Sequence, residues 1–234
     1  MKPGFQYYQF SFDEVRPDIS EVYDFLRLID LEDEHPARLF VRNIFPELQS
    51  NKDIMGGYVI RDIQSIYPKQ GIILIDDVEL PAGKQVCGYL KDATQVALFL
   101  CTGGKFFSDL TQELNKKGDI LEAYIVDAIG SITVEKAMDV VQAKLEISAR
   151  SEGLSISNRY SPGYCNWALS SQRILFNLVG ANPVPIRLSE SSLMKPIKSV
   201  SGIIGIGSNI KKREYGCKIC NNIDCIYRKI ISNN

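Results

Sequence analysis

The sequence predicts an α+β fold, because helical and β-type patterns are interleaved along its 234 residues without the regular strand–helix–strand alternation of a parallel sheet. Two segments carry this prediction. Gln95–Thr102 is a nearly continuous apolar run, which is typical of a strand covered on both faces. Asp119–Arg150 is the longest helical pattern in the chain.

The segments before residue 95 predict two helices and then two strands. Asp18–Leu28 has apolar residues near helical spacing after an acidic first turn, and Pro36–Leu48 begins with a proline, which suits a first helical turn. Tyr58–Ile66 and Gly71–Ile75 are rich in β-branched residues, and a Pro-Lys-Gln-Gly turn signal separates them. We therefore expect a strand pair here.

The second half continues with the same mixture. A Thr-Gly-Gly turn at 102–104 precedes a helix that extends through Leu114, and a loop is expected at 151–166. A further helix is predicted at Leu169–Val179, and strands at Pro183–Leu188 and Val200–Ile206.

Two acids follow the apolar face of the long helix. Its stripe is formed by residues spaced four, three and four apart, namely Leu121, Ile125, Ala128 and Ile132. Continuing the stripe by three and four residues leads to Glu135 and Asp139. Either these acids point into a core or cleft, or the helix turns this face to solvent there.

Composition restricts the class of function. The formal net charge is −1, so no overall basic field favours nucleic acid or an anionic membrane. The N-terminus lacks a signal-peptide pattern and no apolar stretch is long enough to span a bilayer, so we expect a cytoplasmic protein. A Ser-His-Asp triad or a multi-histidine zinc site would depend on His35, the single histidine.

The six cysteines form two groups. Three lie apart in structured segments and are expected to be small buried side chains: Cys87, Cys101 and Cys165. The other three, Cys217, Cys220 and Cys225, fall within nine residues.

The turn Arg159–Tyr164, Arg-Tyr-Ser-Pro-Gly-Tyr, combines groups that suit an amino-acid or nucleoside ligand. Its proline and glycine force a tight turn that exposes the backbone, its arginine can grip a carboxylate, and its tyrosine can stack on a flat base. The alternative is a surface turn with an ordinary salt bridge. Leu188–Pro196 likewise either lines a cavity with hydroxyl groups or forms a loop that leads into an edge strand.

Together these segments resemble the activation domain of cobalamin-dependent methionine synthase. Arg159-x-Ser-Pro-Gly-Tyr164, Ser189-Glu-Ser-x-x-Met194 and Ser199-Val-Ser-Gly202 are similar to that family's R-P-A-P-G-Y, T-E-S-x-x-M and S-V-S-G motifs in order and spacing. The resemblance covers roughly 97–205. It divides the chain into an N-terminal helical and β part (1–90), a core (91–208) and a cysteine-bearing tail (209–234).

The resemblance implies a fold and a ligand site. It implies a C-shaped single domain with a mainly antiparallel twisted sheet flanked by helices. In the family, this turn and an acid on the long helix contact S-adenosylmethionine. The corresponding residues here are Glu135, Arg159, Ser161, Gly163 and Tyr164. A carboxylate suits the ammonium group of the ligand, and Arg159 suits its carboxylate.

The resemblance also implies partners. It suggests a component of a methyltransferase system in methionine biosynthesis rather than a complete enzyme. Such a component presents the methyl donor to an oxidised cobalamin, and a flavodoxin-like protein supplies an electron for this reductive methylation. Since no cobalamin-, folate- or homocysteine-binding domain is recognisable in the sequence, the expected partner is a separate methionine synthase that lacks its own activation domain.

The sequence departs from the family pattern in two places. Cys165-Asn166-Trp167 follows the turn, and Trp167 either stacks on a ligand or partner or packs inside the protein. Beyond Gly207 the chain carries a C-x2-C-x4-C cluster that can hold zinc or an iron–sulfur cluster with a fourth ligand, or remain reduced. Two other functions therefore stay open: a zinc- or iron–sulfur-containing redox activator of another corrinoid protein, and an interaction module without the ligand.

Overall fold

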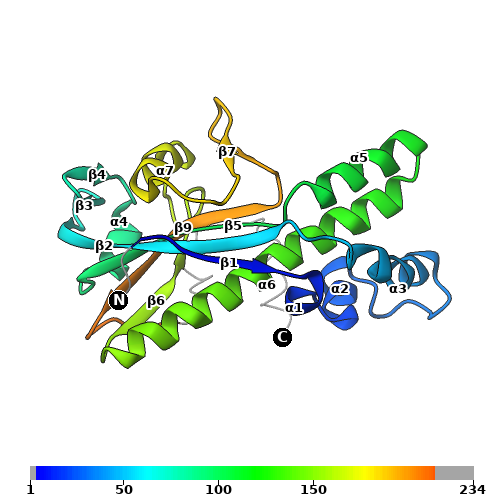
Figure 1. The fold of residues 1–234 in the computed structure, drawn as a ribbon, viewed down its shortest axis with the longest axis horizontal. Coiled ribbons are helices and arrows are strands. Elements are labelled where there is room, and N and C mark those ends of the chain that lie inside the picture. The colour runs from blue at the N-terminus through cyan, green and yellow to red at the C-terminus, as the bar shows by residue number, and fades with distance from the viewer. Residues whose placement is uncertain (1–3, 214–234) are drawn as a thin grey trace.

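One antiparallel sheet organises the chain, of which a computed structural model describes residues 4–213 (Figure 1). Within this part the strand order is β4-β3-β2-β5-β9-β6, and β1 pairs with β2 along the same edge as β3. The strands of this sheet are β1 (Gln6–Phe10), β2 (Ile54–Tyr67), β3 (Ile72–Ile75), β4 (Val78–Leu80), β5 (Gln95–Thr102), β6 (Ser155–Tyr160) and β9 (Ser199–Gly207). A separate short hairpin joins β7 (Arg187–Leu188) to β8 (Met194–Lys195).

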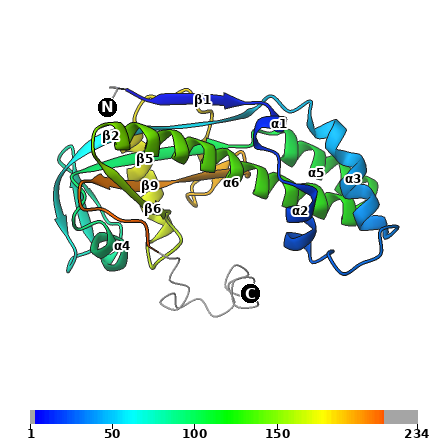
Figure 2. The same ribbon diagram turned by 90° about the horizontal axis from the view of Figure 1, so that it is seen from below.

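Helices cover both faces of the sheet. They are α1 (Phe12–Val15), α2 (Ile19–Leu26), α3 (Pro36–Leu48), α4 (Lys84–Tyr89), α5 (Phe106–Lys117), α6 (Ile120–Ser151) and α7 (Gln172–Val179), with a short 3-10 turn η1 (Leu169–Ser171) before α7. Figure 1 shows α6 along one side of the sheet and α7 on the other, and Figure 2 shows α6 crossing the strands. None of the helices within residues 4–213 is both long enough and apolar enough to cross a bilayer.

The central strand β5 separates two hydrophobic cores. Its side chains alternate between the two faces, as successive residues of a strand must. Ala97, Phe99 and Cys101 belong to the core under α6, whereas Leu98 and Leu100 belong to the core under α4 and α7. The predicted burial of this strand on both faces is confirmed.

The long helix α6 extends beyond the sheet at the end where α5 and the helices α1–α3 pack (Figure 1). Its 32 residues correspond to a length of about 48 Å. The predicted apolar stripe is right at Ile125 and Ala128, which are buried, and wrong at Leu121, which is exposed. Leu121 lies in the first turn of α6, directly after α5, where its face has no core to cover.

Several predicted elements match the structure, and two predictions are wrong. The bounds of α3 and β5 are those expected from the sequence. The expected loop at 151–166 instead contains β6, whose polar composition hid a strand that pairs with β9. The expected strand Pro183–Leu188 contracts to Arg187–Leu188, since prolines 183 and 185 cannot donate backbone hydrogen bonds. The short elements β1, α1, β4, α4 and β8 were not predicted.

The cysteines within the described chain follow the prediction except at one position. Cys87 and Cys101 are buried, whereas Cys165 is partly exposed in the turn after β6. Burial raises the pKa of the Cys87 thiol to about 11 and that of Cys101 to about 12. Both thiols therefore stay protonated at neutral pH.

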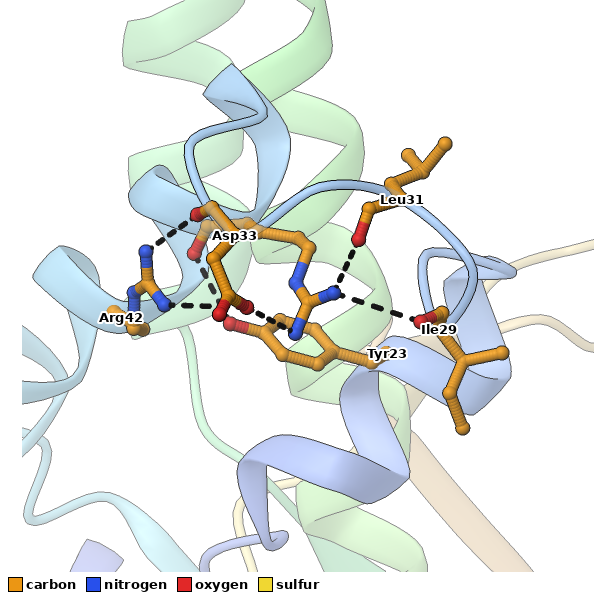
Figure 3. A network of polar contacts seen from close by, with 6 residues as sticks. Tyr23, Ile29, Leu31, Asp33 and Arg42 are labelled. Carbon is orange, nitrogen blue, oxygen red and sulfur yellow. Dashed lines mark hydrogen bonds and ion pairs between the residues drawn. The ribbon is translucent and has the colours of Figure 1, made fainter.

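An arginine network fastens the acidic loop between α2 and α3 (Figure 3). The Arg38 guanidinium donates to the Leu31 carbonyl and forms an ion pair of 2.8 Å with the Asp33 carboxylate. It also lies 4.4 Å from the ring centroid of Tyr23. Arg42 donates to the Asp33 carbonyl at 2.6 Å. Two arginine side chains of α3 thus hold this loop by its main-chain carbonyls.

Candidate functional site

A line of polar side chains runs along α6. Its members Asp127, Ser131, Glu135 and Asp139 are spaced by four residues, so each is a neighbour of the next on the helix surface. Over twelve residues this line extends about 18 Å. Two cations from the sheet side meet it, one near each end: Lys198, which precedes β9, and Arg159 on β6.

Arg159 is directed toward α6 by the register of its strand. It pairs with Ile204 of β9, and Ile204 packs in the core under α6. One terminal nitrogen, Nη2, forms ion pairs of 2.9 Å with Asp139 and 3.3 Å with Glu135. The side chain is only 18% exposed, and its other terminal nitrogen, Nη1, is buried without a hydrogen-bond partner among residues 4–213.

Glu135 lies in an unfavourable place for a charge. Burial raises the pKa of Glu135 above its usual value, Asp139 raises this pKa further, and Arg159 opposes the shift. The attraction of the Arg159 guanidinium therefore offsets only part of the free-energy cost of burying the Glu135 carboxylate beside Asp139. A further cation at Glu135 would be stabilised by the same charges.

At the other end of the polar line, Lys198 forms an ion pair with Asp127. The Lys198 ammonium lies 2.7 Å from the Asp127 carboxylate and donates to the Ser131 hydroxyl at 2.9 Å. The Lys198 side chain is 9% exposed. Sequence analysis did not identify Asp127, Ser131 or Lys198; the four-residue spacing on α6 was the available signal.

The turn after Arg159 is fixed by its own backbone. The Gly163 amide donates to the Trp167 carbonyl at 2.8 Å, and the Trp167 amide donates to the Tyr164 carbonyl at 2.9 Å. Gly163 has φ +95°, a conformation that favours glycine, and a Cβ atom there would meet the Leu169 side chain at 3.9 Å. Tyr164 is 62% exposed, whereas Trp167 is buried. Of the two interpretations of Trp167, internal packing is therefore correct.

Gly202 brings β9 into close approach with the start of this turn. A Cβ atom there would lie 2.2 Å from the Tyr160 carbonyl oxygen and 2.8 Å from the Ser161 hydroxyl oxygen. A larger residue would push the turn away from the sheet. Gly202 thus sets the position of Ser161 next to Arg159.

The fold and the sequence identify the chain together. A sequence model described as the activation domain of vitamin B12 dependent methionine synthase matches residues 88–224. The chain belongs to this family. Its fold is similar to that in a crystal structure of the MetH reactivation domain bound to AdoHcy, with a TM-score of 0.63 and 14% sequence identity over 92% of this chain and 81% of that chain. No curated protein gives a significant match.

The activation-domain family confirms the resemblance that the motifs indicated, and the similar structure confirms an antiparallel sheet flanked by helices. Of the five predicted ligand residues, Glu135 and Arg159 are in direct contact, and Ser161, Gly163 and Tyr164 follow in the adjoining turn. Asp139 was noted in the sequence but given no role, and it is the nearer partner of Arg159.

The remaining candidates have structural roles or lie outside the described residues. His35 accepts a hydrogen bond from the Ala37 amide at the start of α3, as a helix cap. The Ser189 hydroxyl accepts one from the Leu193 amide within the β7–β8 hairpin, which favours the loop interpretation of this segment. Cys217, Cys220 and Cys225 lie beyond the described residues, so a metal there stays a prediction. Residues 4–213 contain no group of three histidine, cysteine or acidic side chains arranged to hold a metal.

Proposed function

We propose that this chain binds S-adenosylmethionine at the Arg159 site, which consists of Arg159, Glu135, Asp139 and the turn Ser161–Tyr164. We further propose that it supports reductive methylation of the cobalamin of a separate methionine synthase that lacks its own activation domain. One observation carries the proposal. Arg159 is held between two carboxylates of α6 and keeps Nη1 buried without a partner in the described structure. A buried donor of this kind needs an acceptor, which a ligand can supply.

The amino-acid end of S-adenosylmethionine fits these charges. Its carboxylate would accept from Arg159 Nη1, and its ammonium would approach Glu135, whose carboxylate now shares the guanidinium with Asp139. Asp139 would keep Arg159 in place when Glu135 engages the ligand. Opposite charges arranged in this way fix orientation as well as affinity.

The nucleoside end would use the turn. Gly163 has no side chain to obstruct a ligand at the backbone, and the exposed Tyr164 ring offers a surface for an adenine ring. Ser161, which packs against Gly202, comes between Arg159 and Tyr164 in the sequence of the turn. Ser161, Gly163 and Tyr164 would therefore contact successive parts of the ligand, from its amino-acid end to its adenine ring.

These contacts indicate which part of the reaction the ligand would perform and which part the residues of this chain would perform. When bound, S-adenosylmethionine supplies an activated methyl group; the residues of this chain bind and orient the donor. Cobalamin on a partner is implied by the family to which the chain belongs. Its location on a separate synthase, and electron supply by a flavodoxin-like protein, are parts of our proposal.

The first test is a calorimetric titration with S-adenosylmethionine, S-adenosylhomocysteine and 5′-methylthioadenosine. The first two ligands should bind saturably, whereas the third, which lacks the amino-acid end, should bind far more weakly. Arg159→Ala should lose this preference, and Arg16→Ala, at the exposed arginine that follows α1, should keep it. Equal binding of all three ligands to the wild-type protein would reject the assignment of Arg159 and Glu135.

A second test addresses the separate partner. A cobalamin-dependent synthase from which the activation domain has been removed is inactivated by oxidation and mixed with this chain, S-adenosylmethionine and a reduced flavodoxin. Recovery of synthase activity that requires both the chain and the methyl donor supports action between separate proteins. Normal ligand binding without recovery would reject that part of the proposal alone.

A further inference from the structure

A polar cavity, here called the Lys211 pocket, lies between the end of α4 and the segment after β9. Its volume is about 430 Å³. It is lined by Tyr89, Lys91, Asp92, Asn209, Ile210, Lys211, Lys212 and Arg213. The pocket shares no residue with the Arg159 site.

The lining is strongly cationic. Four of its side chains are basic, and Asp92 is its one acid. Outside the lining, Glu146 bonds Lys212 at 2.6 Å. With both acids counted against the four cations, the pocket keeps two net positive charges. Lys91 and Lys211 have exposed side chains and form no ion pair within the described residues.

The Arg213 backbone is fixed to the sheet. The Asn158 side-chain amide donates to the Arg213 carbonyl at 2.8 Å and accepts from the Arg213 amide at 2.7 Å. Asn158 belongs to β6, so this wall of the pocket is tied to a strand.

The Arg213 side chain is supported by stacked rings. Its guanidinium lies 5.2 Å from the Tyr89 ring centroid, and Tyr89 stacks on Tyr160 with centroids 5.7 Å apart. The Tyr89 hydroxyl accepts from Gln85 at 2.9 Å. The aromatic ring therefore supports a cation, and two of the four basic residues, Lys212 and Arg213, are held in place before any ligand arrives.

We propose that the Lys211 pocket binds a phosphate-class dianion, either free phosphate or the phosphoryl group of a small molecule. A dianion matches the two net positive charges, and lysine and arginine together offer the donors that phosphoryl oxygens accept. The cavity has the size of a small-molecule site, which leaves room for more than the phosphoryl group. Asp92 disfavours ligands of higher negative charge.

The experiment titrates the full chain with inorganic phosphate and with glycerol 3-phosphate, at constant ionic strength set by chloride, and follows heat or phosphorus NMR line width. The wild-type protein should bind at least one probe saturably. The affinity for glycerol 3-phosphate should rise between about pH 5 and pH 7, because the second ionisation of a phosphate ester has a pKa near 6. Binding of both probes indicates recognition of the phosphoryl group, and binding of inorganic phosphate alone indicates free phosphate.

Paired variants separate the pocket from general surface charge. Lys91→Gln with Lys211→Gln should weaken binding about tenfold, whereas Lys69→Gln with Lys116→Gln, which removes the same charge from two exposed lysines elsewhere, should leave it unchanged. Asp92→Asn should strengthen binding. Equal weakening in the two double variants, or the absence of saturable binding to either probe, would overturn the proposal.

Discussion

Arg38 and Arg159 are similarly buried, with 16% and 18% of their side chains exposed, yet they have different surroundings. Arg38 donates to main-chain carbonyls of the loop it holds, pairs with one carboxylate and lies over the Tyr23 ring (Figure 3). Arg159 meets two carboxylates through one nitrogen and has no carbonyl partner in the described chain. Arg38 thus has main-chain carbonyls among its partners, whereas the partners of Arg159 within residues 4–213 are side-chain carboxylates.

The difference separates a structural arginine from a ligand-binding one. Carbonyl partners belong to the fold, so a ligand cannot replace them without unfolding the loop. Carboxylate partners can be shared with a ligand, because their side chains adjust. Within residues 4–213, each arginine has one buried nitrogen without a hydrogen-bond partner, which is Nε for Arg38 and the terminal Nη1 for Arg159. A terminal nitrogen carries two hydrogens and is the better donor to a carboxylate.

The largest expected effect tests the ligand side of this comparison. Arg159→Ala should weaken S-adenosylmethionine binding by about 2–5 kcal/mol, since Glu135 and the ligand carboxylate both lose their counter-charge. The same measurement on Arg38→Ala should give the wild-type affinity. If both variants bound the ligand equally, the contrast between the two arginines would have no functional meaning.

The structural side of the comparison is tested by denaturation. Arg38→Met should lower the free energy of unfolding by about 2 kcal/mol, because the Leu31 carbonyl and Asp33 lose a charged donor. Arg159→Met should lower it less, since its partners Glu135 and Asp139 are carboxylates with 44% and 61% of their side chains exposed, which water can solvate. Urea titrations of the two variants provide the measurement, and the reverse order would contradict it.

A smaller effect distinguishes the two acids. Glu135→Gln should weaken S-adenosylmethionine binding by about 1–2 kcal/mol through loss of the charge that faces the ammonium. Asp139→Asn should weaken binding less, because this more exposed acid positions Arg159 without contacting the ligand. Titration of both variants at one ionic strength tests the order. A larger loss for Asp139→Asn would transfer the ammonium contact to that residue.

The smallest expected effect is a pH dependence. The folded-state pKa of Glu135 is raised, so between the ordinary and the raised value the folded chain holds a proton that the unfolded chain has released. The free energy of unfolding from this group therefore falls as pH rises through that window. Ligand affinity should change in the opposite sense, because only the ionised carboxylate attracts the ammonium. Both trends should be reduced in Glu135→Gln.

Much of the fold could be predicted from local patterns. The apolar run of β5 and the helical periodicity of α6 mark the centre of the molecule, and the proline that begins α3 marks its first turn. The strand β6 could not be predicted in the same way. Its Ser155–Tyr160 sequence is polar because Arg159 meets the α6 acids, Asn158 bonds the Arg213 backbone and Ser157 accepts from the Gly205 amide. Its pairing partner β9 is more than forty residues away.

The candidate site was predictable through motifs rather than through periodicity. The turn after Arg159 is recognisable as a family motif, and Glu135 was placed by counting along the helix. The closer approach of Asp139 depends on how the strand meets the helix, and the Lys198–Asp127 pair depends on a contact between residues 71 positions apart. Such distances are set by tertiary packing, which a single sequence does not state.

The polar line on α6 contacts two cations, Lys198 and Arg159, whose positions are set by the sheet. Because Lys198 and Arg159 come from the sheet while their partners share one rigid helix, the spacing and the angular phase of that helix determine whether both contacts form together. One residue inserted between Ser131 and Glu135 would rotate the following turns by about 100°. Asp127 would still meet Lys198, but Glu135 and Asp139 would face away from Arg159.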